Sequence, residues 1–213
     1  MCSFKKVGNQ LKKKSYISEK RDSEEIIKER LSYLTISLCL NSSDLVFIDE
    51  TGTNLSMNRA YARAKIGKRA ISINRVSKGK LLTLVGAMSI NGMIACMTYE
   101  GGTKIETFLT YLDKVLCPTL RTGNIVIMDN LSVHKCPEVR ELIESRGAFL
   151  LYLPRYSPDF NPIELCWSKI KSYLKKKKAQ DYKLLETYIK EALDTITIEN
   201  AKGWFSHCGY FVT

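Results

Sequence analysis

Two short apolar segments of the chain end in carboxylates, a position that often supports metal-dependent chemistry. LVFIDE (residues 45–50) ends in Asp49 and Glu50, and NIVIMDN (residues 124–130) places Asp129 after a similar run. Such runs are typical of strands buried on both faces, and open α/β sheets bind ligands at the carboxyl ends of their strands. Because side chains alternate along a strand, only one of the two adjacent acids can share the face of the preceding phenylalanine, and the strand pattern does not choose between them.

A third carboxylate, Glu164, lies at the start of a predicted helix in YSPDFNPIELCWSKIK. Asn161 is expected to be the N-cap and Pro162 the first helical residue, which puts Glu164 where a capping-box glutamate reaches back to the cap. We favour a second interpretation, in which Asn161 and Pro162 define the helix start and Glu164 is free to bind a metal ion. The helix is expected to bury an apolar stripe of Ile163, Cys166, Trp167, Ile170 and Leu174.

The polar flank of this helix combines the acid with cations. Glu164, Ser168, Lys171 and Lys175 are three or four residues apart and are expected to project from one side of the helix. The carboxylate at the helix start would hold a metal ion, and the lysines further along would bind phosphates.

Three carboxylates in a chain with only two histidines favour Mg²⁺ over zinc, because Mg²⁺ prefers hard oxygen ligands. Two such ions about 3.5–4 Å apart activate an attacking water or 3′-hydroxyl and stabilise the leaving oxygen of an in-line phosphoryl displacement. A site of this kind needs no covalent nucleophile. Without metal the clustered carboxylates repel one another, so we expect the metal-free protein to lose stability there.

The net charge of +11, from 33 Lys and Arg against 22 Asp and Glu, suits a polyanionic partner such as nucleic acid. The basic residues form clusters, and the alternative for each cluster is a solvated, solubilising surface. Seven cysteines without a C-x-x-C pair, no signal-peptide pattern and no apolar run of roughly 20 residues favour a soluble, cytoplasmic protein with reduced thiols and no membrane partner. The basic clusters are KKK at 12–14, KIGKR at 65–69, RVSKGK at 75–80 and KKKK at 175–178.

The order of predicted elements favours an α/β fold with a mixed β-sheet flanked by α-helices and with extra C-terminal helices. Residues 1–22 are basic and polar and predict a linker or tail, whereas residues 23–213 predict one domain. Asn91-Gly92 predicts the turn of a β-hairpin.

Two helix starts are predicted from local signals. Ser23 is expected to cap a helix that buries one apolar face, and Thr103 with Glu106 is expected to form a capping box. The apolar face of the first of these helices consists of Ile26, Ile27, Leu31 and Leu34.

Three longer motifs carry a resemblance to a known family: VFIDETG at 46–52, IVIMDNLSVHK at 125–135 and LYLPRYSPDFNPIELCWSKIK at 151–171. With these motifs the chain resembles the catalytic domain of DDE transposases of the mariner superfamily, in its bacterial insertion-sequence branch. The 34 residues between Asp129 and Glu164 equal the separation that this branch keeps between its second and third acids.

The resemblance implies an RNase H-like, integrase-type DDE catalytic domain over residues 23–213. It also implies that Asp49, Asp129 and Glu164 are the catalytic, metal-binding acids. The implied activity is Mg²⁺-dependent cleavage of transposon ends followed by strand transfer at TA targets, with two Mg²⁺ ions that Mn²⁺ can replace.

Further site residues and DNA contacts are predicted from their position beside the acids and from their charge. Asn130 and His134 are candidates for orienting a ligand carboxylate, and His134 also for contacting phosphate; the alternative is that both only structure their loop. Arg155 stands where the family more often has a second proline, and an extra cation suits a site near DNA. The predicted DNA-binding residues are Lys65, Lys68, Arg69, Arg155, Lys171 and Lys175.

The expected partners follow from what this family binds and from one departure from its pattern. Members of this branch usually carry an N-terminal helix-turn-helix region, and nothing of that kind precedes Lys12. We therefore expect a DNA-bound homodimer or higher assembly in the nucleoid, with a separately encoded helix-turn-helix protein as a further partner. The alternative function is a non-catalytic DNA-binding or assembly remnant of a split or decayed transposase. A ribonuclease H or junction resolvase is less expected, because SPDFNPIE has no reason to occur there.

Overall fold

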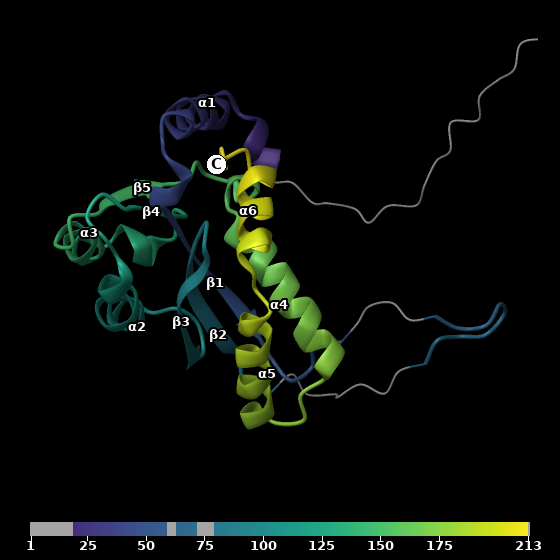
Figure 1. The fold of residues 1–213 in the computed structure, drawn as a ribbon. Helices are drawn as coiled ribbons and strands as arrows, with labels where there is room; N and C mark the ends of the chain where they lie inside the picture. Colours follow the sequence, from purple (N-terminus) through teal and green to yellow (C-terminus); the bar gives the residue numbers. More distant parts are fainter. Residues whose placement is uncertain (1–18, 59–62, 72–78, 213) are drawn as a thin grey trace, which may run out of the picture.

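A mixed five-stranded sheet lies at the centre of the protein (Figure 1). Its strands are β1 (Leu45–Thr53), β2 (Leu82–Ser89), β3 (Gly92–Glu100), β4 (Ile125–Met128) and β5 (Phe149–Tyr152), in the spatial order β3-β2-β1-β4-β5. β2 pairs antiparallel with β1 and β3, whereas β4 pairs parallel with β1 and β5. The computed structural model describes residues 19–58, 63–71 and 79–212. The predicted hairpin is confirmed, with Gly92 at a φ of 112° as the first residue of β3.

Helices cover both faces of the sheet, which confirms the predicted mixed α/β architecture (Figure 1). One face carries α2 (Ile105–Tyr111) and α3 (Pro137–Glu144), and the other carries α4 (Ile163–Lys177), α5 (Tyr182–Asp194) and α6 (Ile198–His207). The first helix, α1 (Glu24–Leu38), lies near the C-terminal end of the chain, where the hydroxyls of Tyr33 and Tyr210 are 2.7 Å apart.

The side chains of β1 alternate between two hydrophobic layers. Phe47 packs in the layer that contains α4, whereas Ile48 packs in the layer that contains α2 and α3. By the same alternation Asp49 belongs to the α4 side of the sheet and Glu50 to the α2 side. The two adjacent acids therefore have different neighbours.

The buried face of α1 differs from the prediction. The helix begins after Ser23 as expected, but the Ser23 side chain makes no capping bond. Ile26 and Tyr33 are its buried side chains, whereas the other predicted core residues, Ile27, Leu31 and Leu34, are exposed. Charged residues of α1, among them Glu29 and Arg30, contact the loop before α4 and orient the helix. The apolar spacing of the sequence therefore did not predict which side of α1 is buried.

The predicted capping box at α2 is also wrong. The helix begins at Ile105 with Lys104 in the cap position, and no side chain makes a capping bond. The hydroxyl of Thr103 lies 2.7 Å from the hydroxyl of Tyr99 on β3. A contact with the neighbouring strand thus replaces the local cap.

Part of the predicted linker is structured. Residues 19–22 form a short 3₁₀ helix, η1 (Glu19–Asp22), while the KKK cluster at 12–14 lies outside the described residues, as does RVSKGK except for its last two residues. The described helices include none long and apolar enough to cross a membrane. The cysteines in the described part of the chain are all free thiols.

A glycine in β2 allows α4 to pack closely on the sheet. Gly86 pairs with Asp49 in the neighbouring strand, and a Cβ atom at Gly86 would lie 2.8 Å from the Trp167 ring and 2.6 Å from the Met93 methyl group. Trp167 belongs to the apolar stripe of α4, and all five members of that stripe are buried, as predicted. The close approach of α4 therefore depends on a residue without a side chain next to Asp49.

Gly86→Ala is expected to lower the free energy of unfolding by about 1–3 kcal/mol, because overpacking forces the rigid Trp167 ring to move. Urea denaturation measures the change. Gly102→Ala is the matched control, since a Cβ there meets no atom within 4 Å. A loss at Gly86 no larger than at Gly102 would show that the packing of α4 does not require this glycine.

Candidate active site

The three predicted acids line one cavity at the edge of the sheet. Asp49 lies in β1, Asp129 directly follows β4, and Glu164 lies in the first turn of α4. The prediction that Asp49 ends its strand is wrong, because β1 continues to Thr53. β1 pairs parallel with β4 only as far as Phe47, and Asp49 lies two residues further along, level with Asp129 just beyond the end of β4. The cavity has a volume of about 420 Å³ and is lined by Asp49, Asp129, Asn130, Leu131, Leu153, Pro154, Arg155, Tyr156, Ser157, Pro158, Asn161 and Glu164.

These acids impede one another's ionisation. Burial, followed by the charge of Glu164 and then by those of Glu50 and Asp129, raises the pKa of Asp49 to about 8. Burial also raises the pKa of Glu164; Lys171 opposes this shift and Asp129 adds to it. A cation placed among the acids would favour their charged forms and lower both pKa values.

Glu164 does not form the capping box that its position suggested. α4 begins at Ile163 with Pro162 in the cap position, and no side chain makes a capping bond there. The amides of Glu164 and Leu165 instead donate to the backbone carbonyls of Asn161 and Pro162, at 3.2 and 3.1 Å. The prediction of Asn161 as N-cap is therefore wrong, because a backbone turn satisfies the first amides and leaves the Glu164 carboxylate at the cavity.

A buried histidine holds Asp129. Nδ1 of His134 lies 2.7 Å from Oδ1 of Asp129, and Nε2 lies 3.1 Å from Oε1 of Glu50. Burial against Phe108 lowers the pKa of His134, but the bonds to Asp129 and Glu50 outweigh burial and raise that pKa to about 9. At neutral pH the imidazolium therefore donates one N–H hydrogen bond to each carboxylate.

The bound imidazolium keeps Asp129 ionised. Burial opposes ionisation, but the hydrogen bonds from His134 and from the Leu131 amide lower the pKa of Asp129 below its usual value. The Leu131 amide donates to Oδ1 at 2.9 Å, so this atom has two donors. The environment of Asp49 therefore opposes its ionisation, whereas the environment of Asp129 favours it.

Glu50 is the site residue that sequence reasoning missed. The strand pattern offered Asp49 or Glu50 as alternatives. In the structure Asp49 lines the acid cavity, and Glu50, on the opposite face of β1, contacts His134. Only 11% of the Glu50 side chain is exposed. The available signal was the adjacent pair of acids together with a histidine five residues after Asp129, but their contact spans 84 residues of sequence.

Two further predicted residues make contacts that structure the cavity. Asn130 donates from Nδ2 to the Leu153 carbonyl at 2.5 Å, which joins the loops after β4 and β5. The guanidinium of Arg155 lies 2.6 Å from the carboxylates of both Glu25 and Glu29 on α1. These ion pairs neutralise Arg155, so a phosphate could bind it only in competition with them.

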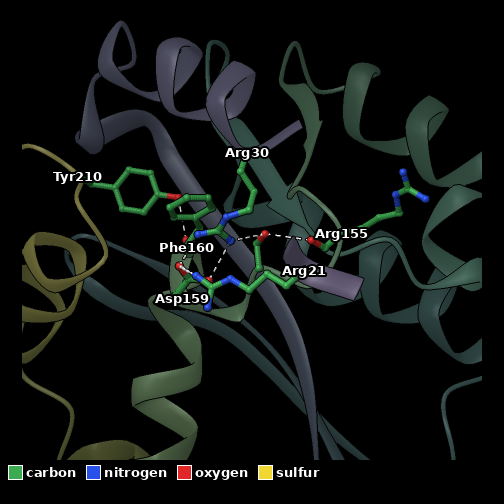
Figure 2. A network of polar contacts seen from close by, with 7 residues as sticks. Arg21, Arg30, Arg155, Asp159, Phe160 and Tyr210 are labelled. Atoms are coloured by element: carbon green, nitrogen blue, oxygen red, sulfur yellow. Dashed lines mark hydrogen bonds and ion pairs between the residues drawn. The ribbon is translucent and has the colours of Figure 1, made fainter. Parts of the chain in front are cut away.

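Arg30 of α1 holds the loop that forms one wall of the cavity (Figure 2). It donates to both carboxylate oxygens of Asp159 at 3.1 and 2.7 Å, and to the Ser157 hydroxyl at 2.6 Å. Arg21 adds a second ion pair to Asp159 at 3.0 Å. The segment before β1 therefore restrains the loop between β5 and α4.

The same loop is restrained from the C-terminal end of the chain. The Arg30 guanidinium lies over the Phe160 ring, 4.3 Å from its centroid, and the Tyr210 hydroxyl donates to the Phe160 carbonyl at 2.7 Å (Figure 2). Segments from both ends of the domain thus hold the wall that leads into Glu164.

A polar groove extends from the acid cavity along α4. Glu164, Ser168, Lys171 and Lys175 line it together with Trp167 and Ser172, so the acid and the two lysines lie on one side of the helix. The other predicted basic residues, Lys65, Lys68 and Arg69, are exposed in segment 63–71 between β1 and β2. This segment lies away from the sheet and helices (Figure 1).

The described residues contain no group of three or more His, Cys, Asp or Glu already arranged around a metal position. The donor set nevertheless fits a hard cation, because three carboxylates line one cavity and the pKa values of two of them are raised. Mutual repulsion favours separated carboxylates in the metal-free site.

Comparison with known proteins identifies both sequence and fold relatives. A family described as DDE superfamily endonuclease matches residues 44–186, which include all three acids. The Mos1 transposase paired-end complex with left transposon end is 20% identical, with a TM-score of 0.76 over 97% of this chain and 69% of that chain. No curated protein matches the sequence.

Two further solved structures share the fold. The Mos1 Strand Transfer Complex is 18% identical, with a TM-score of 0.74 over 95% of this chain and 62% of that chain. The mariner Mos1 paired end complex with Mg is 16% identical, with a TM-score of 0.75 over 97% and 69% of the two chains. The likeness confirms the predicted RNase H-like fold, and the chain spans 62–69% of the length of these relatives.

Asp49→Asn is expected to stabilise the metal-free protein increasingly as pH rises. Asp49 ionises near pH 3.8 when unfolded and near pH 8 when folded, so the wild type loses stability relative to the variant between these values. The variant should exceed the wild type in free energy of unfolding by at least about 1 kcal/mol at high pH, since one pKa unit corresponds to about 1.4 kcal/mol. Urea denaturation in EDTA at about pH 5 and about pH 8.5 measures this difference between variant and wild type. An equal difference at both pH values would contradict the raised pKa of Asp49.

Glu50→Ala is expected to lower the free energy of unfolding by about 1–3 kcal/mol, because a buried imidazolium loses one of its acceptors. Glu50→Gln retains an acceptor and should lose less. Glu100→Ala is the matched control, because Glu100 lies on the same sheet and forms an exposed pair with Lys80. Equal losses at Glu50 and Glu100 in urea denaturation would rule out the buried contact with His134.

Proposed function

The chain belongs to the family of DDE superfamily endonucleases, and from this premise we propose that it is the catalytic domain of a transposase. It cleaves DNA at transposon ends and transfers the cut strands into target DNA by phosphoryl transfer. The observation that carries the proposal is the single cavity lined by Asp49, Asp129 and Glu164. The motif around Glu164 and its spacing from Asp129 support assignment to the bacterial insertion-sequence branch of the mariner superfamily.

Each acid contributes differently to the site. Asp129 presents an ionised carboxylate whose Oδ1 atom is held by His134 and the Leu131 amide. Asp49 has a pKa of about 8 without a cation, so a cation held among the acids would favour release of its proton. Glu164 faces the cavity from α4 without a capping partner, so its carboxylate is available to the same cation.

The three carboxylates would hold two Mg²⁺ ions, which Mn²⁺ can replace. Such ions activate an attacking water or 3′-hydroxyl and stabilise the leaving oxygen of the phosphodiester. The oxygen-rich donor set and the raised pKa values of Asp49 and Glu164 support this cofactor.

The DNA backbone is proposed to follow the groove along α4. Lys171 and Lys175 continue from Glu164 on the same side of the helix, where they can bind successive phosphates. The exposed residues Lys65, Lys68 and Arg69 provide further contacts to DNA in this proposal. Arg155 has a different role, because its ion pairs with α1 anchor the cavity wall.

The proposed assembly contains transposon ends, a TA-type target and at least two copies of this chain, in the nucleoid of the cytoplasm. A separately encoded helix-turn-helix protein would recognise the terminal repeats. The paired-end and strand-transfer complexes of Mos1, which share this fold, support an assembly on DNA.

A non-catalytic DNA-binding or assembly remnant of a transposase is the second candidate. Its DNA binding would use the groove that contains Lys171 and Lys175, which needs no metal ion. The two candidates differ in one outcome, because a remnant binds DNA but does not cut it.

Incubation of the purified chain with Mg²⁺ and a plasmid carrying the DNA on both sides of its gene is expected to give nicks. Asp129→Ala and Glu164→Gln should reduce nicking at least about 100-fold, because each removes a proposed metal ligand. Glu164→Gln should change the free energy of unfolding by less than about 1 kcal/mol, since it makes no cap. Gel electrophoresis and urea denaturation measure the two effects.

Glu100→Gln is the matched control for nicking, because it removes an exposed carboxylate on β3 that does not line the acid cavity. Nicking that survives in Asp129→Ala would exclude the proposed activity of this site. DNA binding without Mg²⁺-dependent nicking would support the non-catalytic remnant.

A further inference from the structure

Glu50 is a buried carboxylate that does not line the acid cavity. Its side chain is 11% exposed and lies on the face of β1 whose residues Val46 and Ile48 pack in the layer of α2. It contacts Nε2 of His134 at 3.1 Å. Because an apolar residue often stabilises such a position as well as a buried ion pair does, stability alone does not account for an acid here.

The His134 ring is fixed by contacts from several elements. The ring lies against Phe108 of α2, with centroids 4.6 Å apart, and the Tyr152 hydroxyl at the end of β5 donates to the His134 carbonyl at 2.7 Å. The two ring nitrogens contact Oδ1 of Asp129 and Oε1 of Glu50. Rotation of the ring would break both of these contacts, so Glu50 helps to fix the direction in which Nδ1 points.

Asp129 depends more on such outside contacts than the other two acids do. Asp49 is held within β1 and Glu164 within α4, whereas Asp129 follows the last residue of β4 and its side chain is 52% exposed. Groups on loops are held less precisely than groups on strands or helices. Oδ1 of Asp129 receives His134 and the Leu131 amide, and no hydrogen bond within the described residues reaches Oδ2. Oδ2 is therefore the oxygen that remains for a ligand.

We propose that Glu50 is a positioning residue of the metal site: from the far face of β1 it fixes the His134 ring, which holds Oδ1 of Asp129 and leaves Oδ2 for the cation. The inference rests on the proposed function, whose cofactor is that cation. Removal of a group that orients a metal ligand typically weakens metal binding about 10–100-fold. Glu50 thus contributes to metal affinity without touching the metal ion.

Three substitutions at Glu50 separate its position from its charge. Glu50→Leu removes the contact with His134 and should weaken binding of Mn²⁺ about 10–100-fold in isothermal titration calorimetry. Glu50→Gln keeps an acceptor for Nε2 without the charge, so it should weaken binding less than Glu50→Leu does. Glu50→Asp keeps the charge but is one methylene shorter, so it should weaken binding about as much as Glu50→Leu. The Mn²⁺ concentration that gives half-maximal nicking should rise by the same factors.

Asn124→Leu is the matched control for a loss of stability. Asn124 precedes β4, at the end of that strand opposite to Asp129, and its buried side chain accepts from the Arg121 amide and donates to the Asp44 carbonyl. The variant should lower the free energy of unfolding in urea but leave the affinity for Mn²⁺ unchanged. A stability loss alone therefore does not reproduce the effect expected at Glu50.

The proposal is overturned if folded Glu50→Leu binds Mn²⁺ as tightly as the wild type. It is equally overturned if Glu50→Gln weakens binding more than Glu50→Asp does, because charge rather than position would then explain the effect. This second comparison decides the matter even if Glu50→Leu does not fold. A wild type that binds no Mn²⁺, or an Asp129→Ala variant that binds it as tightly as the wild type, would refute the proposed metal site itself and this inference with it.

Discussion

The crowding of carboxylates at the carboxyl edge of the sheet is the constraint on which the rest of the structure depends. Burial and the neighbouring charges of Glu164, Glu50 and Asp129 raise the pKa of Asp49 to about 8. A fold that served stability alone would avoid this arrangement, because like charges repel and buried charges lose solvation. Such strain between ionisable groups is typical of sites that gain a cation or substrate.

The surrounding structure distributes this charge between the two faces of the sheet. On the α2 side, one buried imidazolium bridges Glu50 and Asp129 and keeps Asp129 ionised. On the α4 side, Gly86 lets Trp167 approach β2 next to Asp49, and Glu164 at the start of α4 lines the same cavity as Asp49. One imidazolium thus balances part of the charge of Glu50 and Asp129, whereas Asp49 and Glu164, which share the cavity with Asp129, have only the influence of Lys171 on Glu164.

The wall opposite the acids is held by charged contacts that span the domain. Arg30 and Arg21 join the segment before β1 to Asp159, and Arg155 joins the same wall to two glutamates of α1. This arrangement gives Arg155, predicted from sequence to contact DNA, a neutral ion-paired environment. Within the described residues, Oδ1 of Asn161 in this wall is a buried acceptor without a hydrogen-bond partner.

Local patterns in the sequence determined the elements and the identity of the principal acids. The apolar run before Asp129, the Asn91-Gly92 turn and the helical stripe through Trp167 depend on neighbours within a few residues, so they could be read directly. The motifs around Glu164 supplied the family. The cap assignments failed although the contacts are local, because Thr103 pairs with Tyr99 at the end of the preceding strand and a backbone turn at Asn161 satisfies the first amides of α4.

Only the tertiary structure decided which charges meet. The contact of Glu50 with His134 spans 84 residues, and the pairing of Arg155 with Glu29 spans 126, so neither follows from local spacing. Alternation along β1 predicted that Asp49 and Glu50 face apart, but the layers packed on each face determined their partners. The sequence by itself therefore determined which residues could do chemistry. Packing decided which acid favours ionisation and which resists it, because pKa values and pairing depend on distances in space.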